Sequence, residues 1–227
     1  MNSRVAVLAF LLLVAGQSSL VAQQPSMNSS LSAMSTASLL ACASSGTCDD
    51  TDWDVADELR QRLSADRLIA LYPTQSVQAK AIIVDALYTV KGAKVEEFMR
   101  RVAFSDLHAG QTGEDNHYYP LQYLAKLCDT QALKELNRVE NYQNSYPVSC
   151  MQWQYTLATF GKCGYKPAVP LLAANLDDAC VNNITAAEGS LRKLMPKSKC
   201  WKKAGLNGNF QIESACYASE YHATVRP

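Results

Sequence analysis

The chain has no net charge, because 21 lysines and arginines balance 21 aspartates and glutamates among its 227 residues. Proteins that bind nucleic acid usually carry a clear excess of basic residues, so this balance gives no indication of a nucleic-acid partner. Apolar residues make up 48% of the chain, which excludes a collagen-like or wholly disordered protein and allows one ordinary domain with a core.

Short motifs for catalysis and cofactor binding are also missing. No Cys-x-x-Cys occurs, which removes the usual thioredoxin-like and zinc-ribbon interpretations. No Gly-x-Ser-x-Gly marks a nucleophilic serine, and the glycines at Gly205 and Gly208 lack the spacing and lysine of a phosphate-binding loop. We therefore expect a protein without a cofactor that is not an enzyme.

Charged residues are absent from Val5 to Thr47. Arg4 precedes a short apolar run over 5–15, and small and polar residues follow it, as in a secretory signal peptide. We predict a signal peptide over 1–22; a retained N-terminal anchor is the alternative. No other run of about 18 apolar residues occurs, so we expect an exported protein, periplasmic or extracellular, that is not integral to a membrane after cleavage.

Three segments are expected after the signal peptide. Residues 23–50 are rich in serine, alanine and threonine without sustained periodicity, which predicts a flexible leader. Residues 51–195 carry apolar residues at helical spacing and should form a helical repeat domain. Residues 196–227, rich in lysine and cysteine at their start, should form a cap held by a disulfide.

The repeat domain is predicted to consist of successive helix pairs. Its first helix should follow the acidic cluster at Asp49 and carry Val55, Leu59 and Leu63, and Ser64 should cap the next helix before Pro73. Three hairpins follow, and their apolar stripes contain Ala79, Ile83, Ala86, Val90, Val95, Phe98 and Val102; Leu121, Leu124, Leu127, Leu133, Leu136 and Val139; and Trp153, Leu157, Phe160, Val169, Leu172 and Leu176.

An internal period supports this division. The turn over 127–133 superposes on the turn over 163–169 with an offset of 36, and Val90 precedes Leu127 by 37. Periods of this length are typical of stacked helical hairpins, so the predicted fold is an all-α, short α-solenoid. A fourth first helix carries Ile184, Ala187, Leu191 and Leu194 and ends at Pro196, and no clear partner helix follows it.

The segment from Leu157 to Leu172, with Gly161, Gly164, Pro167 and Ala168 at its turn, resembles the centre of a HEAT-like repeat of the short type found in phycobilisome lyases. The segment from Leu124 to Leu136 is similar. The resemblance covers roughly Ser76 to Met195 and implies a curved α-solenoid that holds other proteins or peptides. Deoxyhypusine hydroxylases share this repeat design but hold iron with His-Glu dipeptides, and no His-Glu dipeptide occurs here.

Eight cysteines in an exported chain indicate up to four disulfides. The cysteines lie at the ends of the expected helices, so we predict bridges between equivalent positions of neighbouring repeats and within the two terminal segments. The predicted pairs are Cys42 with Cys48, Cys128 with Cys163, Cys150 with Cys180, and Cys200 with Cys216. Packed helices lie about 8 to 10 Å apart, whereas a disulfide needs Cα atoms within about 7 Å. Cys163 also aligns with the expected core residue Leu127, so a buried free thiol is the alternative for Cys163.

The long connection between the first and second hairpins has two histidines and three carboxylates. A metal site is chemically conceivable there, although the spacing matches no known ligand pattern. Its candidate ligands are Asp106, His108, Glu114 or Asp115, and His117. The same loop could instead contact a ligand at one edge of the solenoid, and a cysteine nucleophile with a histidine base would define an exported hydrolase.

Aromatic and basic residues supply the candidate binding surface. Tyr118 and Tyr119 are expected at the surface with His117, whereas Trp153 is expected in the core. One lysine precedes each turn and should project to solvent; these are Lys126, Lys162 and Lys193. The favoured function is therefore an exported, non-catalytic scaffold that binds a protein or peptide partner. The alternatives are a metal-binding protein or hydrolase centred on residues 106–119, and a structural envelope protein without a specific ligand.

Overall fold

A computed structural model describes residues 29–45, 47–48, 52–104, 118–138, 149–200 and 210–225. All regular structure in these residues is helical, which confirms the all-α prediction. The α-helices are α1 (Ser29–Ala33), α2 (Thr36–Ser45), α3 (Asp52–Arg62), α4 (Ala65–Leu71), α5 (Val77–Leu87), α6 (Ala93–Phe104), α7 (Tyr118–Lys126), α8 (Thr130–Leu136), α10 (Cys150–Lys162), α11 (Val169–Ala174), α12 (Val181–Leu194) and α13 (Phe210–Val225). Short 3-10 turns lie at Tyr72–Thr74, Lys166–Ala168 and Asn175–Asp177.

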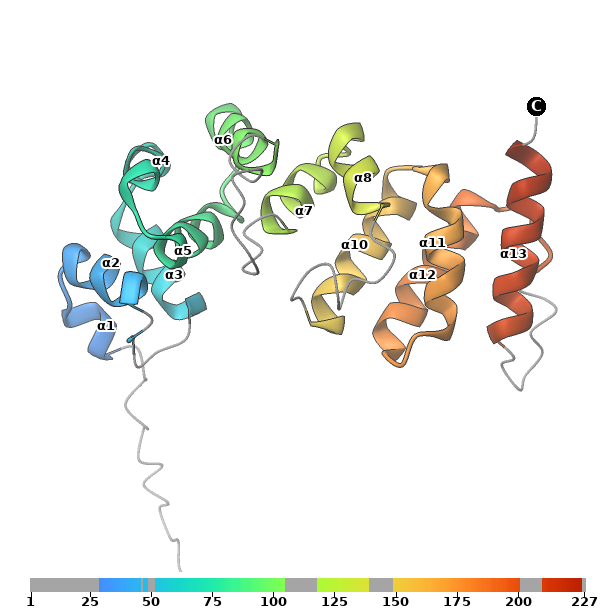
Figure 1. The fold of residues 1–227 in the computed structure, drawn as a ribbon, viewed down its shortest axis with the longest axis horizontal. Helices are drawn as coiled ribbons and strands as arrows, with labels where there is room; N and C mark the ends of the chain where they lie inside the picture. Colours follow the sequence, from blue (N-terminus) through green and yellow to red (C-terminus); the bar gives the residue numbers. More distant parts are fainter. Residues whose placement is uncertain are drawn as a thin grey trace, which may run out of the picture.

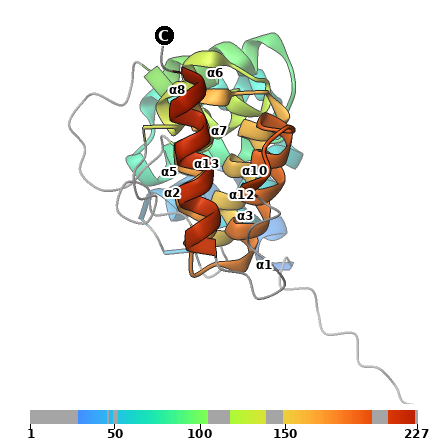
Figure 2. The same cartoon turned by 90° about the vertical axis from the view of Figure 1, so that its right-hand side faces the viewer.

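The helices follow one another along the longest axis of the molecule, from α1 at one end to α13 at the other (Figure 1). Seen from that end, α13 lies in front of the remaining helices (Figure 2). The first helices of successive pairs form a continuous row, in which α3 packs on α5, α5 on α7, α7 on α10 and α10 on α12. Second helices of successive pairs also contact each other, α4 with α6 and α11 with α13.

Side-chain caps begin several helices in the described residues. Ser64 accepts a hydrogen bond from the Arg67 amide at 3.3 Å, which confirms the predicted start of α4. Ser76, Asp129 and Ser149 cap α5, α8 and α10 in the same way. Because a cap satisfies backbone donors that have no partner inside the helix, each one fixes a helix start locally.

The turns after α7 and α10 are the same structure. Cys128 and Gly164, which are offset by 36 residues, have left-handed φ values of 62° and 66°. In both turns the amide of the next residue bonds back to the carbonyl five positions earlier; these bonds are Asp129 N to Leu124 O at 3.1 Å and Tyr165 N to Phe160 O at 3.0 Å. This is a Schellman motif, so these two turns have the same hydrogen bonds at the predicted offset of 36 residues.

Most of the predicted apolar stripes form the buried core, including Leu59, Ile83, Phe98, Leu124 and Phe160. Leu127 was expected in this core but its side chain is 51% exposed. The helix ends at Lys126, and the change of chain direction at Cys128 carries Leu127 away from the interior. Val139 lies outside the described residues.

The prediction of a flexible leader is wrong for residues 29–45, which form α1 and α2. Leu31, Leu39 and Ala43 are buried, and α2 packs against α3 and α5. Arg62 joins α1 to α3, because its guanidinium donates to the carbonyls at the end of α1, Leu31 at 2.8 Å and Ser32 at 3.0 Å. Tertiary contacts therefore supply the stabilisation that the serine-rich sequence does not show.

The C-terminal segment is more regular than predicted. Its main element is α13, a helix of 16 residues that packs on α11. The sequence did not indicate this helix because its apolar residues are spread around the helix axis instead of forming one stripe. Tyr217 on α13 is fully buried, and the bridge from Cys200 to Cys216 holds the helix, so the predicted disulfide-held cap is confirmed as a helix.

Three of the four predicted disulfides are confirmed. The Cα–Cα distances are 5.0 Å for Cys42–Cys48, 5.3 Å for Cys128–Cys163 and 5.6 Å for Cys200–Cys216. Cys163 is therefore not a free thiol. The bridge at Cys128 is short enough because it joins two turns and not the sides of two packed helices. Cys180 is also disulfide-bonded, and the side chain of its predicted partner Cys150 lies outside the described residues.

Candidate functional site

The described residues include five of the six residues predicted to bind a partner. Tyr118, Tyr119 and Lys126 lie on α7, Lys162 lies on α10 and Lys193 lies on α12. The sixth residue, His117, lies outside the described residues. So do all the predicted metal ligands, which are Asp106, His108, Glu114 or Asp115, and His117. The proposed metal site therefore stays a prediction.

Tyr118 was predicted to lie at the surface. It is instead buried, with 1% of its area exposed. Its hydroxyl hydrogen-bonds the Gln152 carbonyl and the Thr156 hydroxyl, both at 2.9 Å, and accepts from the Gln122 amide at 2.8 Å. Gln152 and Thr156 lie on α10, so the Tyr118 ring points into the interface between α7 and α10. Trp153 is buried as predicted.

Tyr119, the next residue, lies at the edge of the same interface. Its ring meets the Tyr88 ring edge to face at a centroid distance of 5.6 Å, and its hydroxyl accepts a hydrogen bond from the Gln152 amide. Tyr88 donates its hydroxyl proton to Gln122 and accepts from the Lys126 ammonium, whose Nζ lies 3.8 Å from the Tyr88 ring centroid. Lys126 is therefore half-buried against an aromatic ring, which corrects the expectation that it projects into solvent.

Burial sets the protonation of this cluster. It raises the pKa of Tyr88 strongly and, together with the carboxylate of Asp85, raises the pKa of Tyr119 to about 12. Burial and the positive charge of Lys162 lower the pKa of Lys126. Both phenols therefore stay protonated at neutral pH and serve as fixed hydrogen-bonding groups.

A tyrosine and a lysine recur at equivalent positions of α7 and α10. Tyr119 and Lys126 are seven residues apart, as are Tyr155 and Lys162, and the two pairs are offset by the repeat length of 36. Seven residues make two helical turns, so each pair occupies one face of its helix. Comparison of the two hairpins position by position could have found this pattern in the sequence.

The two pairs also meet in space. Lys162 donates from its Nζ to the carbonyl of Lys126 at 3.0 Å, and Tyr155 lies near enough to Tyr88 to raise the pKa of the Tyr88 phenol further. The Tyr155 side chain is 56% exposed. We name this set the tyrosine–lysine surface; it consists of Tyr88, Tyr119, Lys126, Tyr155 and Lys162.

Lys193 does not join this surface. It lies exposed in the last turn of α12, as predicted, and within the described part of the chain no hydrogen bond or ion pair links it to the other lysines. The residue seven positions before it is Ala186, so α12 does not repeat the tyrosine. Of the three lysines that precede the predicted turns, only Lys126 and Lys162 therefore belong to this surface.

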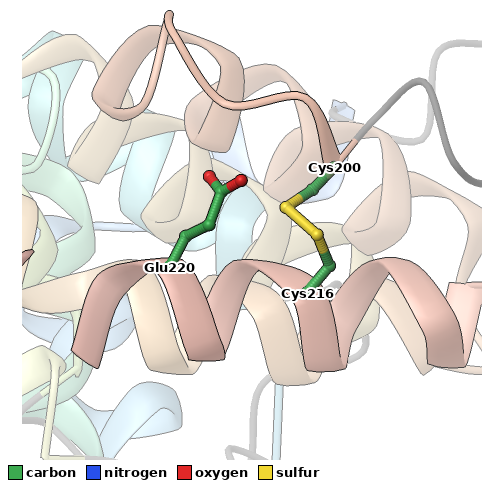
Figure 3. A group of neighbouring side chains, drawn as sticks. All are labelled: Cys200, Cys216 and Glu220. Carbon is green, nitrogen blue, oxygen red and sulfur yellow. A yellow bond between two sulfur atoms is a disulfide. The ribbon is translucent and has the colours of Figure 1, made fainter. Parts of the chain in front are cut away.

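Two other places in the described residues were candidates for a site. Cys200, Cys216 and Glu220 gather within 4.8 Å, but the two sulfur atoms are bonded to each other and leave only Glu220 as a ligand (Figure 3). A groove of about 480 Å³ runs between α4 and α6. Asp66 and Lys94 form an ion pair of 2.8 Å in its lining, so these two charges compensate each other.

No protein-family model, curated protein or solved structure matches the chain.

Proposed function

We propose that the protein is an exported α-solenoid of HEAT-like hairpins that has no catalytic activity and binds a protein or peptide partner. Support for the repeat comes from the continuous row of first helices and from the identical turns after α7 and α10. The bridge between Cys128 and Cys163 joins equivalent regions of adjacent pairs. In a solenoid, each repeat contacts only its neighbours and leaves long surfaces for binding.

Three disulfides support export, because such bonds persist in oxidising compartments. The predicted signal peptide over 1–22 lies outside the described residues. In the residues that the structure describes, no helix combines the length and apolar character needed to cross a membrane.

The observation that carries the binding proposal is the exposed ring of Tyr155 on α10, together with the half-buried rings of Tyr88 and Tyr119, which contact each other. Amphipathic rings of this kind are enriched at binding hot spots. Hydrogen bonds to Gln122 and Gln152 hold the two half-buried rings in place before any partner arrives. A preformed surface loses little conformational entropy on binding, which favours affinity.

A photocrosslinking residue at position 155 tests this proposal directly. The chain with p-benzoylphenylalanine in place of Tyr155 is irradiated in the exported fraction of its native host. We expect one discrete adduct with a protein or peptide. The matched control carries the crosslinker in place of Val181, which is 72% exposed on α12. Equal labelling at both positions, or none at position 155, would contradict binding at this surface.

The competing prediction of a metal site at residues 106–119 has its own assay. Metal content is measured after mild purification of the unmodified chain and of a variant that combines His108→Ala with His117→Ala. Our proposal expects no stoichiometric metal in either sample. Stoichiometric metal that is lost in the variant would replace the scaffold proposal with a metal protein.

A further inference from the structure

We propose, building on the function above, that the tyrosine–lysine surface binds an acidic peptide segment in an extended, polyproline-II-like conformation. Two carboxylates of the segment, three residues apart, would pair with Lys126 and Lys162, and an apolar side chain between them would lie on Tyr155. This inference names the chemistry of the partner and goes beyond the statement that a partner exists.

Charge complementarity is the first support. Some basic side chains in the described residues form ion pairs, for example Arg100 with Asp129 at 2.5 Å. Within the described residues, neither Lys126 nor Lys162 forms an ion pair, and this includes the carboxylate of nearby Asp85.

The two ammonium groups also act on each other. The charge of Lys162 disfavours the protonated form of Lys126, and burial against Tyr88 adds to this cost. A carboxylate placed beside either group would reduce the repulsion and restore the charged form. The surface therefore gains more from an anionic ligand than from a neutral one.

The spacing of the pairs selects the conformation of the ligand. Lys126 and Lys162 occupy equivalent positions of two packed helices, and such helices lie about 8 to 10 Å apart. A polyproline-II segment rises about 3.1 Å per residue and has three residues per turn, so residues three apart point to the same side at about 9 Å. Acidic side chains with this spacing would reach both lysines at once.

The aromatic rings suit the same ligand. Polyproline-II segments bind to surfaces lined by aromatic side chains, and they lose little entropy because their conformation is already extended. Tyr155 offers an exposed ring two helical turns before Lys162 on α10, and Tyr88 and Tyr119 continue the aromatic surface toward α5. An apolar residue such as proline between the two acidic residues would pack against these rings.

Fluorescence anisotropy with labelled synthetic peptides tests the proposal on the mature full chain. The probe peptide repeats Glu-Pro-Pro three times. One comparison peptide replaces every glutamate by lysine, and a second has the same composition with its glutamates consecutive. We expect the regularly spaced acidic peptide to bind most tightly and its affinity to fall as salt concentration rises.

Matched variants separate the proposed contacts from general attraction of acidic peptides. Lys162→Gln and Tyr155→Ala should each raise the Kd of the Glu-Pro-Pro peptide about fivefold, since each removes one contact from an exposed position. Lys193→Gln and Val181→Ala, also exposed and on α12, should change the Kd less than about twofold. Equal effects of Lys162→Gln and Lys193→Gln, or equal binding of the acidic and basic peptides, would overturn the proposal.

Adding the Glu-Pro-Pro peptide during crosslinking at position 155 distinguishes the acidic-peptide proposal from the general scaffold proposal. If the Glu-Pro-Pro peptide suppresses the adduct at position 155, both are supported. If an adduct forms at position 155 but the acidic peptide neither binds nor competes, the partner has another chemistry, and the scaffold function alone survives. If neither an adduct nor peptide binding is observed, both proposals are wrong.

Discussion

Gly161 offers the sharpest test of how α10 and α12 pack. A Cβ atom at this position would lie 2.5 Å from the Oγ, 2.6 Å from the Cα and 2.7 Å from the Cβ of Ser190. The Oγ could rotate away, but the Cα belongs to the backbone of α12. Carbon atoms in contact are normally about 3.5 to 4.0 Å apart, so Gly161→Ala would force the two helices apart by about 1 Å.

Two opposing terms set the size of this effect. Overpacking against a backbone atom costs about 3 kcal/mol, whereas alanine in a helix interior is favoured over glycine by about 1 kcal/mol. We therefore expect Gly161→Ala to lower the free energy of unfolding by about 2 kcal/mol. The buried hydrogen bond from the Ser190 hydroxyl to the Leu157 carbonyl, 2.7 Å long, would lengthen with the same movement.

Urea denaturation followed by circular dichroism, with the disulfides intact, measures this difference. Gly189 on α12 provides the matched control, because a Cβ there would meet nothing within 4 Å. Gly189→Ala should therefore raise the free energy of unfolding by about 1 kcal/mol. Adding Ser190→Gly to Gly161→Ala should restore only part of the loss, since the clash with the backbone of α12 remains. Stabilisation by Gly161→Ala equal to that by Gly189→Ala would refute the close approach of α10 and α12.

Four further changes have defined outcomes. Tyr118→Phe should lower the free energy of unfolding by about 1 to 2 kcal/mol in the same urea assay, because its buried hydrogen-bond partners lose the hydroxyl. Cys128→Ser with Cys163→Ser should lower it by about 4 kcal/mol, since this bridge closes a loop with a sequence separation of 35, and an unchanged midpoint would contradict the bridge. Arg62→Gln should release α1, detected as faster proteolysis within residues 29–45 while the remainder stays intact. Tyr119 has a folded-state pKa of about 12, above its ordinary value of 10.0, so its contribution to stability is complete below pH 10 and disappears as the pH rises toward 12; Tyr119→Phe should remove an absorbance change near pH 12 in an alkaline titration.

Features that depend on a few neighbouring residues were predictable. The start of α4 at Ser64 follows from a hydroxyl that caps the amide three residues later, and the helix pairs follow from apolar spacing. The pairing of Cys128 with Cys163 followed from their equivalent places at the ends of neighbouring repeats. Leu127 was misplaced because α7 ends at Lys126, one residue before Leu127, and the chain changes direction at Cys128.

The burial of Tyr118 and Tyr119 could not be predicted from the sequence. Both are tyrosines at the start of one helix, yet the first is buried and the second lies at the edge of the surface. Adjacent helical residues point about 100° apart, and the sequence does not state which direction the neighbouring helix occupies. Each hydroxyl has a hydrogen-bond partner on α10, more than 30 residues away.

The sequence by itself determined the helical class of the described residues, and it predicted three of the cysteine pairs that the structure contains, because caps and apolar periodicity are local properties and the cysteines lie at the ends of the helices. Only the tertiary structure decided that residues 29–45 and α13 are ordered helices packed on the domain, and that Lys126 lies on Tyr88. These outcomes depend on contacts between segments far apart in the chain, whose energies do not appear until the helices are packed together.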